Sequence, residues 1–331
     1  MRQLSGIAIE LTAKVVLAAG MALVPLRSSA RALGPSEIAM FPKEVAEFAY
    51  TDLKSVQRYP WFLVFRDELL PPHFREFERF LLSAGIDPNT QVDELVWAQL
   101  PTTKKDGEQV VGIGFGSFDP SSNEERFKQQ KLPVTNYQGY HLYASGAATS
   151  AGDILFTFLD SNMAAFGHRS ALEKLVDLRM GRGESLLTNE ALFPLISEAN
   201  GGGVIWAVMD KSNAHRAIQR FIPQANLFPQ AAIILNRMHA MMVNVDAGNS
   251  LDVRFYAVCD SVDDANFLGA ALQAGLLYRR YQEEQTPPDP AQEMAESIRV
   301  TPRGDRLIVE SSVSDDQFGA LIKSKAFVVP K

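Results

Sequence analysis

The pattern of apolar and polar positions predicts short strands that come in adjacent pairs, with helices between the pairs. From Leu251 to Cys259 every second residue is apolar, a period of two that is typical of a half-buried strand. Elsewhere the spacing is three or four, which indicates one apolar helix face, as in Phe74, Phe77, Leu81 and Ala84. Strand pairs separated by helices favour antiparallel sheets covered by helices, and therefore an α+β fold.

The same series of elements is expected twice along the chain. The corresponding fragments are Ala49–Asp52 with Ala207–Asp210, Val110–Phe118 with Leu251–Cys259, and the hairpin around Ser161-Asn162 with the one around Gly304-Asp305. Such self-similarity predicts tandem modules, which we expect to be ferredoxin-like or split β-α-β units. The expected boundaries are 41–184 for module one, 185–200 for a linking helix over Leu186–Ala199, and 201–331 for module two.

The first 32 residues have the pattern of a signal peptide. Arg2 and Lys14 precede an apolar run from Val15 to Leu26, and small residues ending in Ala30-x-Ala32 follow. The run is shorter than the roughly 20 residues that span a bilayer, so no transmembrane segment is expected in the mature chain. Cleavage near Ala32 would place the protein in the periplasm or outside the cell.

An alternative for this segment is the amphipathic first helix of a cytosolic protein, because the stretch before the apolar run is long and contains Glu10. No cysteine follows the run, which excludes a lipoprotein anchor at that site. The single cysteine, Cys259, lies on the apolar face of its predicted strand, where a buried, inert thiol is expected.

Composition limits the partners. The chain has 331 residues, 46% of them hydrophobic and 21% charged, which is typical of a soluble globular protein. A net charge of −7 and a pI near 5.4 argue against nucleic acid as a partner. No motif in the sequence indicates a cofactor.

Tyr137, His141 and Tyr143 are the residues we single out as a candidate ligand surface. They are predicted to share one face of a single strand from Tyr137 to Tyr143, beside a loop of small residues from Ala144 to Gly152. The alternative is a half-buried sheet whose tyrosines keep their hydroxyls in water. A surface of this kind would suit a cell-envelope protein, a glycan or a lipid.

Two other patterns have structural explanations that we prefer. Gly112, Gly114 and Gly116 alternate within a strand, so they predict a bare face for a close-packed helix and not a phosphate loop. Strand alternation places Met238 and Met242 on one face, and His239 and Met241 on the other, which leaves too few ligands per face for a metal site.

Asp52 and Asp210 occupy corresponding positions in the two modules. Two carboxylates brought together could share a proton in acid–base chemistry, but each also ends a strand where Asp is a favoured helix cap. We expect caps. The sequence contains neither a G-x-S-x-G elbow nor an S-x-x-K motif.

Several stretches resemble an uncharacterised domain family of exported bacterial proteins: Ser83–Pro88, Tyr137–Tyr143 and Gly167–Phe193. The resemblance spans roughly residues 41–327 and is carried by caps, turns and a helix linker. It implies an extracytoplasmic α+β protein, and it transfers no catalytic residues.

The function that we expect from these patterns is a non-enzymatic binding or scaffold protein outside the cytoplasmic membrane. It would act through its sheet faces or through a cleft between the modules. The alternative is a cofactor-free hydrolase with a site assembled between the two modules.

Overall fold

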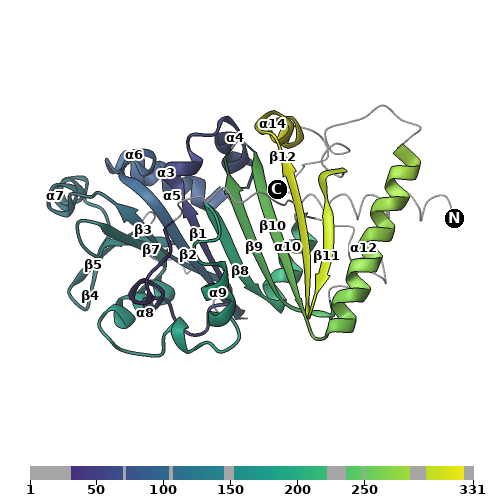
Figure 1. The fold of residues 1–331 in the computed structure, drawn as a ribbon. Helices are drawn as coiled ribbons and strands as arrows, with labels where there is room; N and C mark the ends of the chain where they lie inside the picture. Colours follow the sequence, from purple (N-terminus) through teal and green to yellow (C-terminus); the bar gives the residue numbers. More distant parts are fainter. Residues whose placement is uncertain are drawn as a thin grey trace. The chain divides into compact units, whose positions relative to one another are not determined.

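The structure is a computed structural model that describes residues 31–69, 72–103, 107–144, 153–221, 236–248, 250–283 and 296–323. They form two compact units, whose elements are labelled in Figure 1. The N-terminal unit comprises Arg31–Arg58 and Leu69–Gly201, and the C-terminal unit comprises Tyr59–Glu68 and the described residues from Gly202 onward. Of the predicted leader, residues 1–32, the first 30 lie outside the described residues.

The N-terminal unit is built on an antiparallel sheet with strand order β1-β2-β3-β7-β6-β5-β4. Its strands are β1 (Glu47–Asp52), β2 (Val92–Thr103), β3 (Gly107–Gly116), β4 (Val134–Tyr137), β5 (Tyr140–Ala144), β6 (Ile154–Phe158) and β7 (Met163–His168). Its helices are α2 (Pro35–Ile38), α3 (Leu53–Val56), α5 (Pro72–Ser83), α6 (Pro88–Gln91), α7 (Pro120–Gln130), α8 (Arg169–Arg179), the 3-10 turn η1 (Leu186–Thr188) and α9 (Phe193–Ala199).

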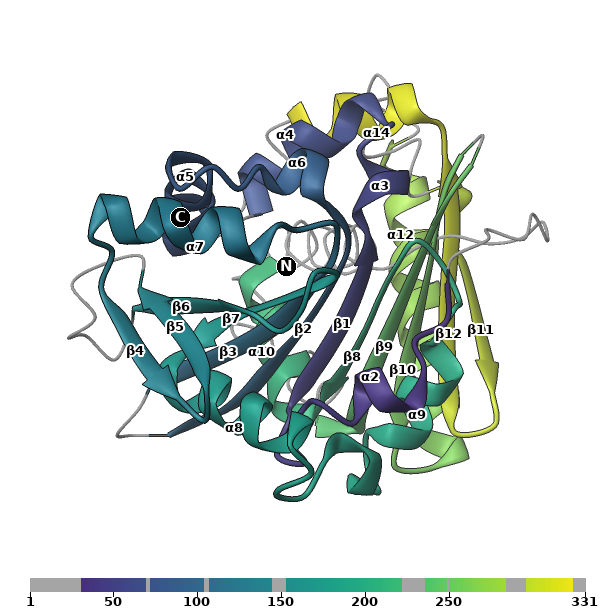
Figure 2. The same ribbon diagram turned by 90° about the vertical axis from the view of Figure 1, so that its left-hand side faces the viewer.

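Helices cover both faces of this sheet. Phe127 of α7 and Phe77 of α5 lie in one aromatic core with Phe156 of β6, and their rings contact it at centroid distances of 5.4 and 6.4 Å. Helix α8 lies on the other face, as Figure 2 shows, and buries Leu172 and Leu175 there. The two faces therefore have separate cores.

The glycine stripe of β3 belongs to the aromatic side. A Cβ added at Gly112 would lie 2.4 Å from Cζ of Phe166, so the bare backbone accommodates a phenyl ring from the neighbouring strand. The expected partner was a helix, and α5 contributes only indirectly, because its Phe77 ring lies against Phe166 at 5.6 Å. The close packing predicted from the glycines is present, but the group that uses it is an aromatic side chain.

The prediction of one linking helix over 186–199 is wrong, because the segment consists of two short helical pieces, η1 and α9. Asn189 separates them, because its side-chain oxygen accepts hydrogen bonds from the amides of Ala191 and Leu192 at 3.1 and 2.8 Å. Its side-chain amide also donates to the carbonyl of Lys43 at 2.8 Å. A turn capped in this way competes with a continuous helix.

The C-terminal unit has an antiparallel sheet with strand order β11-β12-β10-β9-β8. Its strands are β8 (Ile205–Asp210), β9 (Met238–Ala247), β10 (Leu251–Cys259), β11 (Arg299–Arg303) and β12 (Arg306–Val313). Its helices are α4 (Pro60–Leu69), α10 (Lys211–Phe221), α12 (Val262–Glu283) and α14 (Asp315–Lys323).

Residues Tyr59–Glu68 pack in the C-terminal unit, although the sequence pattern assigned them to module one. The Tyr59 hydroxyl donates to the carbonyl of Ala247 at 2.6 Å. The Trp61 indole donates to Asp315 of α14 at 3.0 Å, and its ring contacts Phe318 edge to face at 5.2 Å. These contacts explain why the segment belongs to a unit distant from it in sequence.

Both units are α+β with antiparallel sheets, as the sequence predicts, but their strand order differs from the expected ferredoxin-like one. In a split β-α-β unit the two strands joined by the helix run parallel and are separated by another strand. In the C-terminal unit, β8 and β9 are joined by α10 and yet pair directly with each other, in antiparallel orientation. The alternation of strands and helices in the sequence indicates the layers, but it does not determine which strands are neighbours.

Candidate binding surface

The stretch from Tyr137 to Tyr143 is a tight hairpin, so the prediction of a single strand there is wrong. Strand β4 ends at Tyr137, β5 begins at Tyr140, and these two residues pair across the turn. The two turn residues, Gln138 and Gly139, have φ angles of 51° and 88°. Positive φ at both positions is the signature of the type I′ turn that fits the twist of two-residue hairpins.

The hairpin separates the three predicted surface residues onto opposite faces of the sheet. Paired residues of an antiparallel ladder share a face, so Tyr137 lies with Tyr140, whereas His141 lies with Asn136 and Tyr143 with Val134. Figure 2 shows the hairpin at one end of the N-terminal unit's sheet. The structure therefore does not bring Tyr137 together with His141 and Tyr143.

Tyr143 is part of the core. Its ring contacts Phe127 at 4.8 Å and Phe156 at 5.6 Å, and only 3% of the residue is exposed. Burial, and then the charge of Glu124, raises the pKa of Tyr143 to about 12. This residue cannot serve as a ligand surface in the folded unit.

His141 lies at the edge of the same core. Its Nδ1 is 3.2 Å from a carboxylate oxygen of Glu124 on α7, and its side chain is 42% exposed. The pair ties the hairpin to α7. The loop beside it, from residue 145 to 152, lies outside the described residues.

Tyr137 and Tyr140 form a polar cluster with the C-terminal end of α8, on the opposite face. The Tyr137 hydroxyl donates to Oδ2 of Asp177 at 2.8 Å. This hydrogen bond to a carboxylate, followed by burial, raises the pKa of Tyr137. Arg182, just beyond the helix, donates to the side-chain oxygen of Gln138 at 3.2 Å and lies 3.9 Å from Oδ1 of Asp177.

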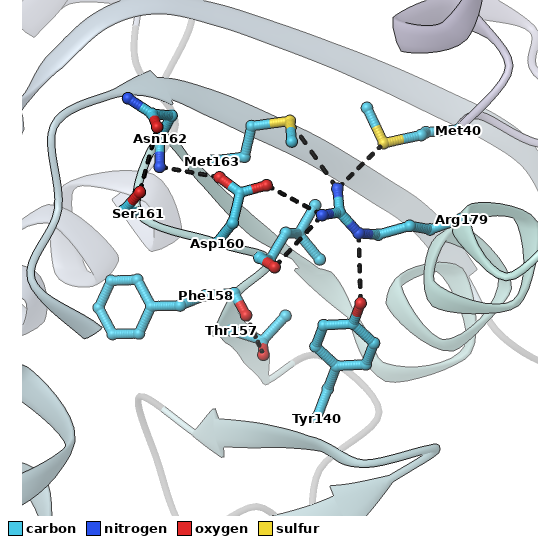
Figure 3. A network of polar contacts seen from close by, with 10 residues as sticks. Met40, Tyr140, Thr157, Phe158, Asp160, Ser161, Asn162, Met163 and Arg179 are labelled. Atoms are coloured by element: carbon cyan, nitrogen blue, oxygen red, sulfur yellow. Dashed lines mark hydrogen bonds and ion pairs between the residues drawn. The ribbon is translucent and has the colours of Figure 1, made fainter. Parts of the chain in front are cut away.

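Arg179 is the centre of the second half of this cluster, which Figure 3 shows. Its Nε donates to the hydroxyl of Tyr140 at 3.2 Å, and its Nη2 donates to Oδ2 of Asp160 at 2.9 Å. Nη2 also donates to the carbonyl of Leu159 at 3.3 Å. One guanidinium thus ties the last turn of α8 to both the β4–β5 hairpin and the turn after β6.

Sulfur atoms complete the surroundings of Arg179. Its Nη1 lies 3.9 Å from the sulfurs of both Met40 and Met163. The Asp160 carboxylate is held in turn, because its Oδ1 accepts a hydrogen bond from the amide of Asn162 at 2.8 Å. The arginine side chain is 24% exposed, so the network is fixed in position and still open to solvent.

We call Tyr137, Gln138, Tyr140, Asp177, Arg179 and Arg182 the tyrosine–arginine surface. Both tyrosines are half-buried, and Gln138 and Gly139 at the tip are exposed. The sequence did reveal Tyr137, but not the face that it occupies. A glycine as the second of two residues between alternating strands is a hairpin signal, and Gln138-Gly139 has that form.

A second polar cluster, missed in the sequence, lies around Glu94 in the same unit. The guanidinium of Arg31 pairs with Glu37, lies 3.5 Å from Oε2 of Glu94, and stands 5.4 Å above the ring of Phe115. Burial raises the pKa of Glu94, and Arg31 opposes this shift. Burial and then the charge of Glu94 also raise the pKa of Tyr50. No sequence signal joins these residues, because the topology alone brings residues 31, 50 and 94 together.

The two repeat-related carboxylates are caps. Oδ1 of Asp52 accepts from the amide of Ser55 at 2.9 Å, and its Oδ2 accepts from the Ser55 hydroxyl at 2.6 Å. Oδ1 of Asp210 accepts from the amide of Asn213 at 2.8 Å. The capping interpretation is confirmed for both residues.

The predicted placement of Met238 and Met241 on opposite faces of their strand is wrong. Met238 and Met241 contribute to the same core, which also contains Cys259, whereas alternation predicted opposite faces. The reason is a register shift at His239: Val258 pairs with Ala240, and Cys259 with Met238. Met242 is buried as well, and exposed His239 lies 3.4 Å from Asp260.

Within the residues that the structure describes, no group of three or more His, Cys, Asp or Glu residues is arranged to hold a metal ion. Nor does any helix there have the length and apolar content needed to cross a bilayer.

No family model and no curated protein matches the chain. Among solved structures, it is similar to TP0453 in crystal form I, with 12% identity, a TM-score of 0.48, and coverage of 89% of this chain and 98% of that one. Crystal form III of TP0453 gives 10% identity, a TM-score of 0.48, and coverage of 87% and 98%. At this level of similarity, a function for the chain has to be argued from its own residues.

Proposed function

We propose that this chain is a non-enzymatic binding or scaffold protein that acts outside the cytoplasmic membrane and contacts a cell-envelope protein through the tyrosine–arginine surface. The observation that carries the proposal is that Tyr137 and Tyr140 lie side by side with their hydroxyls fixed by Asp177 and Arg179. Tyrosine and arginine are the residue types that dominate protein-binding hot spots.

Fixed side chains favour binding, because little rotamer entropy remains to be lost when a partner docks. The two hydroxyls and the guanidinium of Arg179 already have their partners within this unit, and both tyrosine rings remain partly open to solvent. Such a surface offers apolar ring area together with peripheral donors and acceptors, the combination found at protein interfaces.

The end strand β4 adds a second element of recognition. It is the last strand in the order of its sheet, and three of its four residues are exposed, with Val134 at 54%. The amide of Ala144 donates to the carbonyl of Pro133, so the ladder alternation directs the backbone groups of Val134 and Asn136 away from β5. Outward backbone groups of this kind can pair with an extended segment of a partner.

The proposed location rests on the leader pattern alone. The apolar run from Val15 to Leu26 and the small residues up to Ala32 are those of a signal peptide. N-terminal sequencing of the protein from separated cell fractions tests it: a chain that starts near Leu33 in the periplasmic or secreted fraction supports export. An intact Met1 in the cytosol overturns it.

We also propose that the two units arose by duplication. Leaving aside the short helices, both follow the order strand, helix, two strands, helix, then a meander that ends in a helix. The meander has the strands β4 to β7 in one unit and, among the described residues, β11 and β12 in the other. Residual similarity between the two halves in an alignment of related chains would support this origin, and unrelated profiles would contradict it.

The binding proposal is tested by a photo-crosslinking amino acid placed at Gln138, with Lys128 on α7 as the matched exposed control. We expect an adduct with a cell-envelope protein from position 138, lost in Tyr137→Ala and Arg182→Glu chains and absent from position 128. An adduct with a glycan or a lipid would show that the partner is a molecule of that class and not a protein. Absence of an adduct, or an adduct that forms equally well in both substituted chains, would overturn the proposed surface. The non-enzymatic role is tested separately: turnover in an esterase, glycosidase and peptidase panel would overturn it.

A further inference from the structure

Helix α12 packs on the sheet of the C-terminal unit through one apolar face. Ala265, Leu268 and Leu276 lie in the buried core of that unit, with Leu272 packed against it. Gly269 allows a close approach to β11, because a Cβ there would lie 2.5 Å from Cγ of Pro302. This face accounts for the attachment of α12 to its own unit.

The opposite face of α12 is also apolar, and it is exposed. Phe267 and Leu277 are 46% and 64% exposed, and Ala270 and Ala274 between them are exposed as well. The Arg237 guanidinium stands 4.5 Å from the centroid of the Phe267 ring, and the residue remains 46% exposed beside it. A helix that is apolar on two opposite sides is typical of one that contacts two neighbours.

The four exposed residues follow the spacing of a helix–helix seam. Their positions, 267, 270, 274 and 277, are separated by three, four and three residues, as are the a and d positions of a coiled coil. We propose that α12 pairs with α12 of a second copy of this chain, in antiparallel orientation, to form a twofold-symmetric dimer.

Antiparallel pairing makes this seam complementary to itself. With the twofold axis at the middle of the seam, Phe267 meets Leu277 of the partner subunit, and Ala270 meets Ala274 of the partner subunit. Large residues then pair at both ends and small residues at the centre, where the helix backbones can approach closely. A twofold interface requires this reciprocity of contacts.

Charge also favours the antiparallel orientation. The first turn of α12 contains Asp263 and Asp264, so parallel helices would place the acidic turns of both copies together. Antiparallel helices keep these acidic turns apart and oppose the two helix dipoles.

The seam is short, which determines the strength to expect. Stable complexes bury roughly 1,200–2,000 Å², and one pair of helices in contact over about three turns buries less than that. The dimer should therefore be weak and depend on concentration, with dissociation in the micromolar range.

Sedimentation velocity of the purified protein over a hundredfold concentration range tests the dimer. We expect a shift from monomer to dimer that Leu277→Asp abolishes. Leu63→Asp is the matched control, because Leu63 is 55% exposed on α4 of the same unit. Circular dichroism melting of both variants checks folding, and Ala274→Glu provides a second disruption of the seam if Leu277→Asp fails to fold.

Disulfide formation between copies tests the orientation. The one native cysteine, Cys259, is 1% exposed and should remain unreactive. A mixture of Phe267→Cys and Leu277→Cys chains should form a disulfide between the two variants, whereas each variant alone should not. In the antiparallel pair, identical positions lie about 15 Å apart along the axis.

Three results would overturn the proposal. The first is a monomer at every concentration, which would mean that another segment or partner covers this face. The second is a dimer that persists in both seam variants. The third is a disulfide within each single variant, which would indicate parallel helices.

Discussion

The hydroxyl of Tyr137 donates a 2.8 Å hydrogen bond to Oδ2 of Asp177 and thereby ties the tip of the β4–β5 hairpin to α8. Because the acceptor is a carboxylate, the neutral phenol is favoured and the pKa of Tyr137 is raised. The stabilisation is complete below the ordinary tyrosine pKa near 10 and is lost as the pH rises through the raised value.

We predict that Tyr137→Phe lowers the free energy of unfolding by about 1 kcal/mol or less at pH 8, and that this difference disappears in strongly alkaline solution. Urea unfolding at several pH values measures it. As a control, Asp177→Asn keeps an acceptor but removes its charge, and should lower the pKa of Tyr137 in an absorbance titration at 295 nm. The same pKa of Tyr137 in the wild type and in Asp177→Asn would contradict the argument.

Glu94 should make the N-terminal unit sensitive to pH in the acidic range. Burial raises its pKa, so its contribution to stability is complete below the ordinary glutamate pKa and is lost as the pH rises through the raised value. We predict that Glu94→Gln, which cannot ionise, gains stability relative to wild type between pH 4 and pH 7. Urea unfolding at the two pH values measures the gain.

In the chain that keeps its leader, Arg31 opposes this effect, because its charge lowers the pKa of Glu94, whereas the proposed cleavage near Ala32 would remove it. Arg31→Ala should therefore enlarge the gain from Glu94→Gln. Arg169→Ala is the control, since Arg169 pairs with Glu173 on the surface of α8. A Glu94→Gln difference that is the same at both pH values would show that burial does not control this carboxyl.

The caps predict a contrast between two substitutions at one position. Asp52→Ala and Asp210→Ala should each cost about 1 kcal/mol, because the amides of Ser55 and Asn213 lose their acceptors. Asp52→Asn and Asp210→Asn should be nearly neutral, since Asn caps about as well as Asp. Equal losses for Asn and Ala, measured by chemical unfolding, would argue that the charge has another role.

Two glycines of β3 provide a matched pair for packing. Gly112→Ala should cost about 1–3 kcal/mol, because the new Cβ would lie 2.4 Å from Cζ of Phe166 and 2.8 Å from the carbonyl oxygen of Val96. At Gly114 the nearest atom is Cγ1 of Val92 at 3.4 Å, so Gly114→Ala should be close to neutral. Thermal unfolding of the two variants measures these losses of stability, and equal losses would contradict the packing argument.

Cys259 should react with thiol reagents only after unfolding. It is 1% exposed, and burial, followed by the charges of Asp264 and Asp260, raises its pKa to about 11. At pH 8 we expect slow labelling by a chromogenic disulfide, with a rate that rises in step with the unfolded fraction in urea. Rapid labelling without denaturant would contradict this burial.

What could be predicted from the sequence is mostly local. The caps at Asp52 and Asp210 depend on residues three positions away, and the strand over Leu251–Cys259 follows from alternation within one segment. Both were therefore visible in the pattern. The burial of Cys259 followed from the same alternation.

Two of the errors in prediction share a physical cause, which is a local change in the register or direction of the chain. At Gly139 a positive φ turns an expected strand into a hairpin and moves Tyr137 to the other face from Tyr143. At His239 a bulge brings Met238 and Met241 into one core. The polar cluster around Glu94 could not be predicted from local sequence, because only the fold brings Arg31 close to Glu94.

The amide of Leu33 donates to the side-chain oxygen of Asn200, and the Asn200 side-chain amide donates to the carbonyl of Leu33, each at 2.8 Å. The two ends of the N-terminal unit are therefore joined by a reciprocal pair of hydrogen bonds. A domain whose entry and exit points coincide can be inserted into a host chain without stretching it. In evolutionary or engineering terms this unit is suited to transfer as a cassette, provided that the excursion through Tyr59–Glu68 is replaced by a short loop.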